Sequence, residues 1–303
     1  MKQTKVGVSY TIIAYVLWGI LPLYWKLIEH VPASEILAHR IIWSFIFVLS
    51  IIIFKNRFMN FKKEFNSLLN RPKKLAAVFL AGVLVSGNWF IYIWAVNTDH
   101  LIEASLGYYI NPLLSVLLGV LVLREKLTKW QIISVLFAGI GVGILTLQYG
   151  KVPWIALSLA LSFALYGLAK KLVKLDSLFG LAIETSIVTP IAFIYLGTIQ
   201  AQGTSVFLSS SFSTVLLLIG SGVATAIPLL CFAEGVKRIP LSMNGFFQYL
   251  APTISLLIGV FIFKEEFTKV HLASFTSIWC GLVIYTASNL HLGKQTEKKT
   301  LRA

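Results

Sequence analysis

Charged side chains are scarce in this sequence, and acidic ones are the scarcest. Of its 303 residues, 13% are charged and 57% are hydrophobic, whereas soluble domains carry about 25% charged residues. So little charge cannot cover the apolar surface that a water-soluble chain of this length would expose. The composition therefore excludes an ordinary soluble enzyme or binding domain.

Cysteine is nearly absent as well. The chain has two cysteines, Cys231 and Cys280, and both fall within apolar runs, which indicates reduced packing residues and no disulfide framework. The sequence also lacks an H-E-x-x-H motif, a G-x-S-x-G motif and paired Cys/His spacing. We therefore expect no enzyme activity, no bound metal and no cofactor.

The stretch FAGIGVGIL, with Gly139, Gly141 and Gly143, follows no predicted strand and is therefore no dinucleotide-binding loop. Without a nucleotide site, ATP is not a direct energy source. The spacing of these glycines is typical of close helix packing, either within the chain or at the face of a homodimer.

Long apolar runs, by contrast, are abundant. Each spans about 19–23 residues, which is the length a helix needs to cross a hydrocarbon core of roughly 30 Å. The runs lie near residues 7–27, 36–54, 75–97, 101–123, 130–148, 152–170, 180–200, 213–235, 240–263 and 270–290. The sequence therefore predicts an all-α polytopic membrane protein with ten transmembrane helices.

The net charge of +14 is distributed unevenly along the chain. With the N-terminus inside, most lysines and arginines fall in inside segments, including the block Lys55–Lys74 and the tail from Lys294. This bias predicts that both termini are cytoplasmic. Anionic lipid headgroups account for the basic charge, so we expect the lipid bilayer as a partner and no nucleic acid.

The second half of the sequence repeats the first after a shift of 140 residues. GYYINPLLSVLLGVLVLREKLTKW, from 107 to 130, aligns with FQYLAPTISLLIGVFIFKEEFTKV, from 247 to 270. Pro112 thereby meets Pro252, and Thr128 meets Thr268. Each half holds five predicted helices, and because five is odd the second half enters from the opposite side of the membrane.

Inverted-topology repeats of this kind are the architecture of many secondary transporters, whose substrate lies near the membrane midplane between the repeats. We expect one repeat over residues 1–148, a second over residues 149–292, and a basic cytoplasmic tail over residues 293–303.

The five-plus-five repeat resembles the drug/metabolite transporter superfamily and its EamA-type repeats. The stretches VPASEILAHRIIWS, GNWFIYIWAVN, EASLGYYINPLL and GFFQYLAPT are similar to the RarD group in particular. The resemblance covers the chain except the tail and the loop near 201–212, and it implies a multi-pass permease of the cell membrane for small organic molecules. We expect efflux of metabolites or drug-like compounds by alternating access around a midplane cavity, with a passive channel or a membrane sensor or partner subunit as alternatives.

Candidate cavity residues are polar or amphipathic side chains at membrane depth. They are Trp18, Asn88, Tyr108, Asn111, Tyr166 and Gln248. Such groups usually face the bundle interior and often mark a substrate path, although amides also serve as interhelical hydrogen-bond partners and aromatic rings as interfacial anchors. Pro112 and Pro252 each remove a backbone hydrogen bond, so we expect helix breaks there that face protein or the cavity.

Arg40 is the one basic residue that lies clearly within a predicted span, where an unpaired guanidinium is costly. Glu35, Asp99 and Glu103 are the carboxylates near enough to pair with it. We favour a structural Arg40–Glu103 tether over a role of Arg40 in attracting an anionic substrate.

Glu184 lies about one turn inside the seventh span, where Lys170 or Lys174 can reach it. The choice is between a structural ion pair and a site of proton coupling, for which Glu103 is the other candidate because a buried carboxyl group can exchange protons near physiological pH. Coupling to a proton, exchange of a second solute and facilitated diffusion all stay open.

Overall fold

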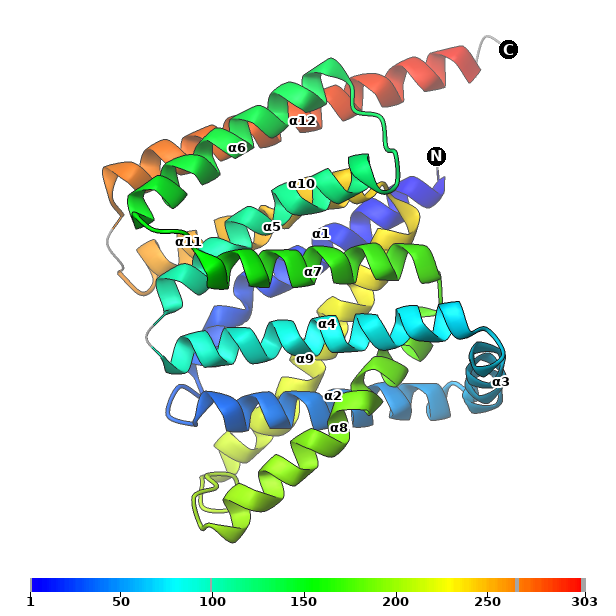
Figure 1. The fold of residues 1–303 in the computed structure, drawn as a ribbon, viewed down its shortest axis with the longest axis vertical. Coiled ribbons are helices and arrows are strands. Elements are labelled where there is room, and N and C mark those ends of the chain that lie inside the picture. Colours follow the sequence, from blue (N-terminus) through cyan, green and yellow to red (C-terminus); the bar gives the residue numbers. More distant parts are fainter. Residues whose placement is uncertain (1, 99, 265–266, 301–303) are drawn as a thin grey trace.

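The computed structural model describes residues 2–98, 100–264 and 267–300, and within these ranges the chain is helical and contains no strand. Its helices are α1 (Lys2–Lys26), α2 (Ala33–Phe54), α3 (Phe58–Leu69), α4 (Pro72–Asn97), α5 (Leu101–Leu121), α6 (Lys129–Tyr149), α7 (Trp154–Val173), α8 (Ser177–Ala201), α9 (Phe212–Arg238), α10 (Leu241–Gln248), α11 (Leu250–Phe261) and α12 (Lys269–Thr300). Ten segments of the described chain are long and apolar enough to cross a membrane, with α10 and α11 together forming one of them. The predicted multi-pass helical architecture is confirmed (Figure 1).

The last span of each half begins with the same capping structure. The Thr128 hydroxyl accepts the backbone N–H of Gln131 at 3.3 Å, and the Gln131 side chain accepts the backbone N–H of Thr128 at 2.8 Å. Thr268 and His271 form the same reciprocal pair, both bonds being 3.3 Å long. Reciprocal capping satisfies N–H groups that a helix start leaves without partners. The two threonines that align in the sequence therefore mark equivalent helix starts.

The turn before each of these caps also repeats. Arg124 adopts a left-handed backbone conformation with φ 55°, and Lys264, the residue that aligns with it, does so with φ 60°. Residues other than glycine seldom adopt this conformation. Its occurrence at matching positions shows that the repeat extends from sequence to loop geometry.

The two five-helix repeats interlock instead of standing side by side. By position in its repeat, α1 corresponds to α7, α2 to α8, α4 to α9, α5 to α10 with α11, and α6 to α12. Helix α1 packs against α9 and α11, just as α7 packs against α4 and α5, while α2 packs on α8 and α6 on α12. Helices α1 and α7 run in opposite directions (Figure 1), as inverted repeats require.

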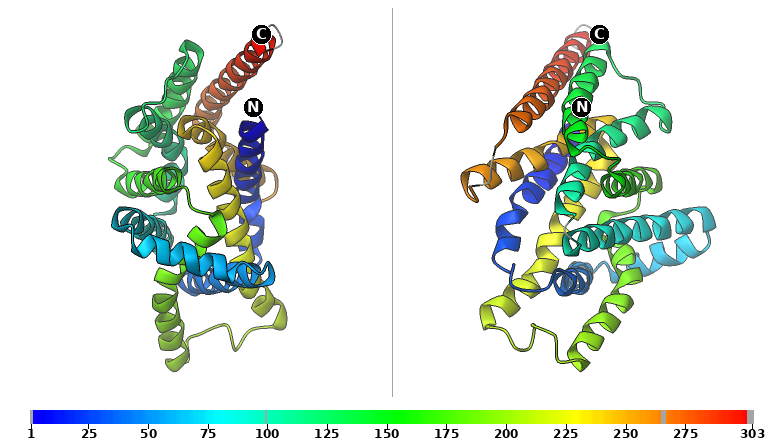
Figure 2. Two further views of the ribbon diagram at one scale, coloured as in Figure 1. Left: turned by 90° about the vertical axis from the view of Figure 1, so that its right-hand side faces the viewer. Right: turned by 60° about the vertical axis from the view of Figure 1, so that its left-hand side comes forward.

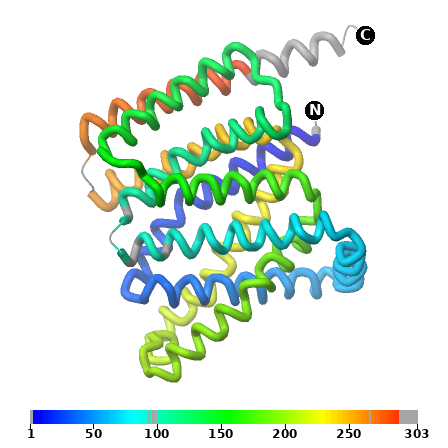
Figure 3. Tube along the Cα trace, viewed as in Figure 1, coloured from blue at the N-terminus to red at the C-terminus, as the bar shows by residue number. Residues whose placement is uncertain are grey.

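Helices α6 and α12 lie side by side at one end of the bundle's long axis, opposite the loop between α8 and α9 (Figures 2 and 3). A Cβ atom on Gly141 would lie 2.5 Å from the Ser274 carbonyl oxygen, and one on Gly281 would lie 2.7 Å from that of Ser134. Only glycine permits so close an approach. Because Gly141 aligns with Gly281 and Ser134 with Ser274, the contact is reciprocal about the axis that relates the repeats.

The basic block Lys55–Lys74 contains a helix that the sequence analysis did not predict. Helix α3 lies on the same side of the bundle as the chain ends (Figure 1). Its Phe61 packs against Phe179 with ring centroids 5.6 Å apart, and its Leu68 is buried against the ends of α4, α7 and α8. The apolar residues recur at helical spacing, but the lysines between them conceal the pattern from a search for apolar runs.

Candidate functional site

A cavity of about 340 Å³ lies between the two repeats, near the lower end of the range of about 300–1,000 Å³ that small-molecule sites occupy. Its lining comes from α1, α2, α4 and α5 of the first repeat and from α7, α9, α10 and α11 of the second. The lining residues are Tyr15, Trp18, Leu21, Pro22, Trp25, Arg40, Asn88, Trp89, Tyr92, Ser105, Gly107, Tyr108, Tyr109, Asn111, Leu159, Phe163, Thr225, Leu229, Gln248, Ala251, Pro252 and Ser255.

The cavity occupies one half of the bundle. Its lining residues lie near the middle of their helices or toward the ends that are distant from the chain termini. On α2, for example, which begins at Ala33 on that distant side, only Arg40 reaches the cavity. In the half of the bundle nearer the termini, large side chains such as Tyr166 and Phe232 are fully buried and stack on each other.

Five of the six cavity candidates line the cavity: Trp18, Asn88, Tyr108, Asn111 and Gln248. Tyr166 does not. It is fully buried, stacks on Phe232 with ring centroids 5.8 Å apart and donates a hydrogen bond of 3.2 Å to Glu184. The reason is the inversion itself: Tyr166 corresponds to Trp18, but α7 runs opposite to α1, so the two rings lie on opposite sides of the midplane.

The amides join helices of the two repeats at the cavity wall. Asn88 Nδ2 on α4 donates to the Leu159 carbonyl at 2.8 Å and to the Ser162 hydroxyl at 2.9 Å, both on α7. The Ser115 hydroxyl on α5 donates to Gln248 Oε1 on α10 at 3.2 Å. All three bonds cross the repeat boundary, so these amides are interhelical partners as well as part of the cavity surface.

The two prolines differ in their surroundings. The ninth span breaks at Tyr249, three residues before Pro252, and Pro252 lines the cavity. Pro112 lies within the continuous helix α5 and outside the cavity lining. A Cβ atom on Gly245 would lie 2.7 Å from the Pro112 carbonyl oxygen, so α10 presses closely on this turn. Of the two expected breaks, the one before Pro252 is a single-residue turn at Tyr249, where the backbone angles stay helical, and at Pro112 the helix is continuous.

Arg40 does not form the expected tether to Glu103. Its Nε donates to the Thr225 hydroxyl at 3.0 Å, and its guanidinium lies 4.7 Å from the ring centre of Trp25 and 5.7 Å from that of Trp89. Among the described residues, no carboxylate lies within 4.0 Å of an Arg40 nitrogen. Asp99, the other partner considered, lies outside the described residues.

Glu103 is engaged elsewhere. It accepts a hydrogen bond of 2.5 Å from the Tyr149 hydroxyl and one of 2.7 Å from the backbone N–H of Ile155, in the first turn of α7. The free N–H groups and positive dipole end of a helix start attract a carboxylate. This local attraction holds Glu103 away from Arg40.

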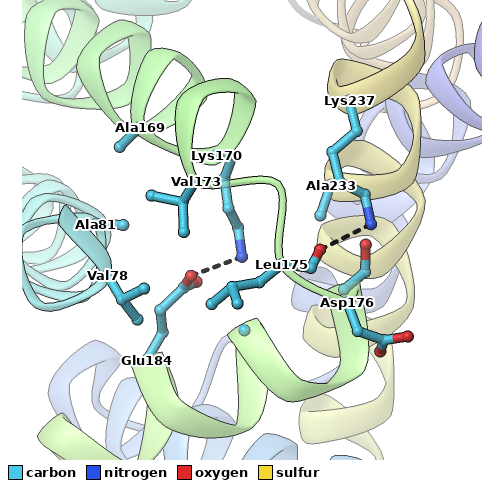
Figure 4. Close-up of a pocket in the computed structure, with 12 residues that line it drawn as sticks. Val78, Ala81, Ala169, Lys170, Val173, Leu175, Asp176, Glu184, Ala233 and Lys237 are labelled. Atoms are coloured by element: carbon cyan, nitrogen blue, oxygen red, sulfur yellow. Dashed lines mark hydrogen bonds and ion pairs between the residues drawn. The ribbon is translucent and has the colours of Figure 1, made fainter. Parts of the chain in front are cut away.

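Glu184 forms a buried ion pair with Lys170, whose Nζ lies 2.6 Å from Oε1; the two side chains are 3% and 9% exposed. The pair, drawn in Figure 4, borders a pocket of about 20 Å³, which has room for about one water molecule. It lies outside the large cavity, in the half of the bundle nearer the termini. The part of the chain that the structure describes holds no group of three or more His, Cys, Asp or Glu side chains placed to bind a metal.

Comparison with known proteins assigns the repeats to a family. The model of the EamA-like transporter family matches residues 5–147 and, a second time, residues 151–287. The transporter YojE of Bacillus subtilis is 50% identical, with 95% of this chain and 96% of YojE covered. Protein RarD of Escherichia coli is 40% identical, with 98% and 99% covered. A solved crystal structure has the same fold, with a TM-score of 0.68 at 19% identity, covering 95% of this chain and 98% of that one.

Proposed function

The chain belongs to the EamA-like transporter family, and on this premise we propose that it is a permease of the cell membrane that exports small organic molecules. The observation that supports the proposal most directly is the cavity of about 340 Å³ between the repeats. Because both repeats contribute its walls, a movement of one against the other would change access to it, as in other transporters built from inverted repeats.

Contacts in the half nearer the termini favour an alternating-access mechanism. The Tyr15 hydroxyl and the Asn244 amide lie 3.1 Å apart across α1 and α10. Glu125, in the loop after α5, accepts the backbone N–H groups of Leu241 and Ser242 at 2.7 and 2.9 Å. With the termini in the cytoplasm, as the charge distribution predicts, the cavity would face outward and these contacts would close the inner side.

The energy source that we propose is exchange of solutes or the gradient of the substrate itself. Among the described residues, no carboxylate lines the cavity. The two coupling candidates, Glu103 and Glu184, lie outside it and are bound to other groups. A proton bound at either position would not meet the substrate directly.

Counterflow in proteoliposomes tests the carrier function. Solutes exported by cells that contain the protein, and retained by cells that lack it, would be identified by untargeted metabolite comparison and then loaded into vesicles. We expect saturable uptake that is accelerated by solute on the opposite side. A passive channel would give flux without acceleration, and a sensor or partner subunit would give no flux.

A cavity-filling variant makes this test specific to the site. Ser255→Trp places a large ring in the lining, whereas Ser209→Trp places the same ring in the exposed loop between α8 and α9. Counterflow is expected to be lost in Ser255→Trp and retained in Ser209→Trp. Equal activity of the two variants would contradict transport through this cavity.

A further inference from the structure

The described lining of the large cavity carries a single formal charge. Of its described lining residues, Arg40 alone is ionised, and all the others are apolar, aromatic, hydroxyl or amide side chains. A guanidinium at membrane depth is costly unless an opposite charge accompanies it. No carboxylate among the described residues lies within 4.0 Å of Arg40 to supply that charge.

The environment of Arg40 leaves it free to bind a ligand. Its Nε is held by Thr225 at 3.0 Å, and Trp25 lies against the guanidinium at 4.7 Å. These two contacts fix the plane of the group but leave its terminal N–H groups without a hydrogen-bond partner in the described chain. An arginine fixed in this way matches the two oxygens of a carboxylate, which bind it through two parallel hydrogen bonds.

Aromatic side chains form much of the remaining surface. The Tyr92 and Tyr108 rings pack at 6.0 Å between centroids, and the Trp18 and Phe163 rings at 5.7 Å. Rings of this kind attract planar apolar groups and, in the absence of a positive charge, organic cations as well. Arg40 repels a cation in the same space. An amino group would also find no carboxylate among the described lining residues.

We propose that the cavity binds organic anions composed of an aromatic ring and a carboxylate, with Arg40 as the partner of the carboxylate. The proposal names a substrate class for the proposed transport function and rests on that function only for the movement of the ligand. Binding itself can be measured without transport.

Three compounds with one carbon skeleton test the charge preference: 3-phenylpropanoate, its neutral amide, and 3-phenylpropylamine as the cation. Binding to the purified protein in nanodiscs would be measured by titration calorimetry. A charged hydrogen-bonded pair predicts that the carboxylate binds about 10- to 100-fold more tightly than the amide. The amine is expected to bind more weakly still. Equal binding of the three, preference for the amine, or no binding of the carboxylate would overturn the proposal.

Variants at Arg40 test which residue causes the preference. Arg40→Gln is expected to abolish the advantage of the carboxylate over the amide. Arg40→Lys is expected to retain part of it, because lysine keeps the positive charge but cannot form the two parallel hydrogen bonds of a guanidinium. Arg57→Gln is the matched control, since Arg57 pairs with Asp176 at 2.9 Å outside the cavity. A carboxylate preference that survives Arg40→Gln would assign it to another group and overturn the proposal.

The same compounds separate this proposal from the proposed function. Preferential binding of the carboxylate without counterflow of any compound would leave the binding site intact and contradict transport. Saturable counterflow with no preference among the three charges would leave transport intact and contradict the assignment of Arg40.

Discussion

Carboxylates at the ends of spans distant from the termini bind backbone N–H groups. Glu35 accepts the N–H groups of Val206 and Phe207, each at 3.0 Å, and Glu103 accepts that of Ile155 at 2.7 Å. Buried N–H groups without partners are costly, and a hydrogen bond to a charged acceptor contributes about 1.5–3 kcal/mol. Glu35 and Glu103 therefore hold a loop and a helix start in place, and neither of them pairs with Arg40.

Glu103→Gln should therefore reduce stability without changing the surroundings of Arg40. The neutral amide keeps an acceptor for Ile155 but loses the charge, and we expect a loss of about 1–2 kcal/mol. Equilibrium unfolding of Glu103→Gln, Arg40→Gln and the double variant measures their coupling. We expect the two effects to add, as for residues without contact. A coupling energy above about 1 kcal/mol would reinstate the tether that the sequence analysis favoured.

The Lys170–Glu184 pair gives a second prediction at this scale. Glu184→Gln leaves the Lys170 ammonium buried without an opposite charge, which should cost about 3–5 kcal/mol in equilibrium unfolding. Replacing both residues with apolar ones, as Lys170→Met with Glu184→Leu, should recover most of that loss. Because the pair lies outside the cavity, counterflow by the double variant should persist. If this variant folds but loses a flux driven by a proton gradient, Glu184 is a coupling residue after all.

Among the elements, spans could be predicted from the sequence far better than breaks and surface helices. The run near 213–235 corresponds to α9, Phe212–Arg238, because hydrocarbon thickness fixes the length of a span. The paired prolines indicated where a helix was weakened. The helix is interrupted before Pro252 and continuous through Pro112. The two positions differ in contacts between distant segments, such as the close approach of Gly245 to Pro112, which no local pattern contains.

The contact between α6 and α12 provides a prediction at the scale of elements. Gly141→Leu forces a side chain into the Ser274 backbone and should destabilise the protein by about 1–3 kcal/mol or more. Gly139→Leu, two residues earlier on the same helix, has nothing within 4 Å of its Cβ position and is the matched control. The measurement is equilibrium unfolding together with mass determination. Dissociation of a dimer by Gly139→Leu would instead support the expected homodimer face.

At the scale of the whole molecule, the inverted repeat was predictable and the side on which its cavity lies was not. Aligned prolines, glycines and threonines reveal two copies, and an odd number of spans per copy implies inversion. In the alternating-access mechanism that we propose, the cavity position depends on which half is closed, and two such states differ by only a few kcal/mol. The prediction that Tyr166 lines the cavity, made because it corresponds to Trp18, was wrong for this reason. The two repeats are similar in sequence, but the cavity lies on one side of the bundle only, so Trp18 lines it and Tyr166 is buried.

The closing contacts can be tested through Glu125, whose carboxylate links the loop after α5 to the start of α10. It accepts the backbone N–H groups of Leu241 and Ser242 and, at 2.6 Å, the Ser242 hydroxyl. Glu125→Gln removes the charge from these bonds, each of which contributes about 1.5–3 kcal/mol. Since the bonds belong to the state with the cavity on the distant side, their loss should shift the population toward the opposite state.

The shift can be measured as the reactivity of a cysteine introduced into the cavity lining by Ser255→Cys. The two native cysteines are removed by Cys231→Ser and Cys280→Ser. A membrane-impermeant maleimide added outside should label this cysteine, because we propose that the cavity faces outward. Adding Glu125→Gln should slow labelling, by up to about 10-fold for a shift of about 1.4 kcal/mol in the balance between the two states. Glu29→Gln, which breaks an exposed pair with Lys26, should leave the rate unchanged. Faster labelling in Glu125→Gln would mean that these contacts favour the inward-facing state, and labelling only from inside would reverse the proposed orientation of the whole bundle.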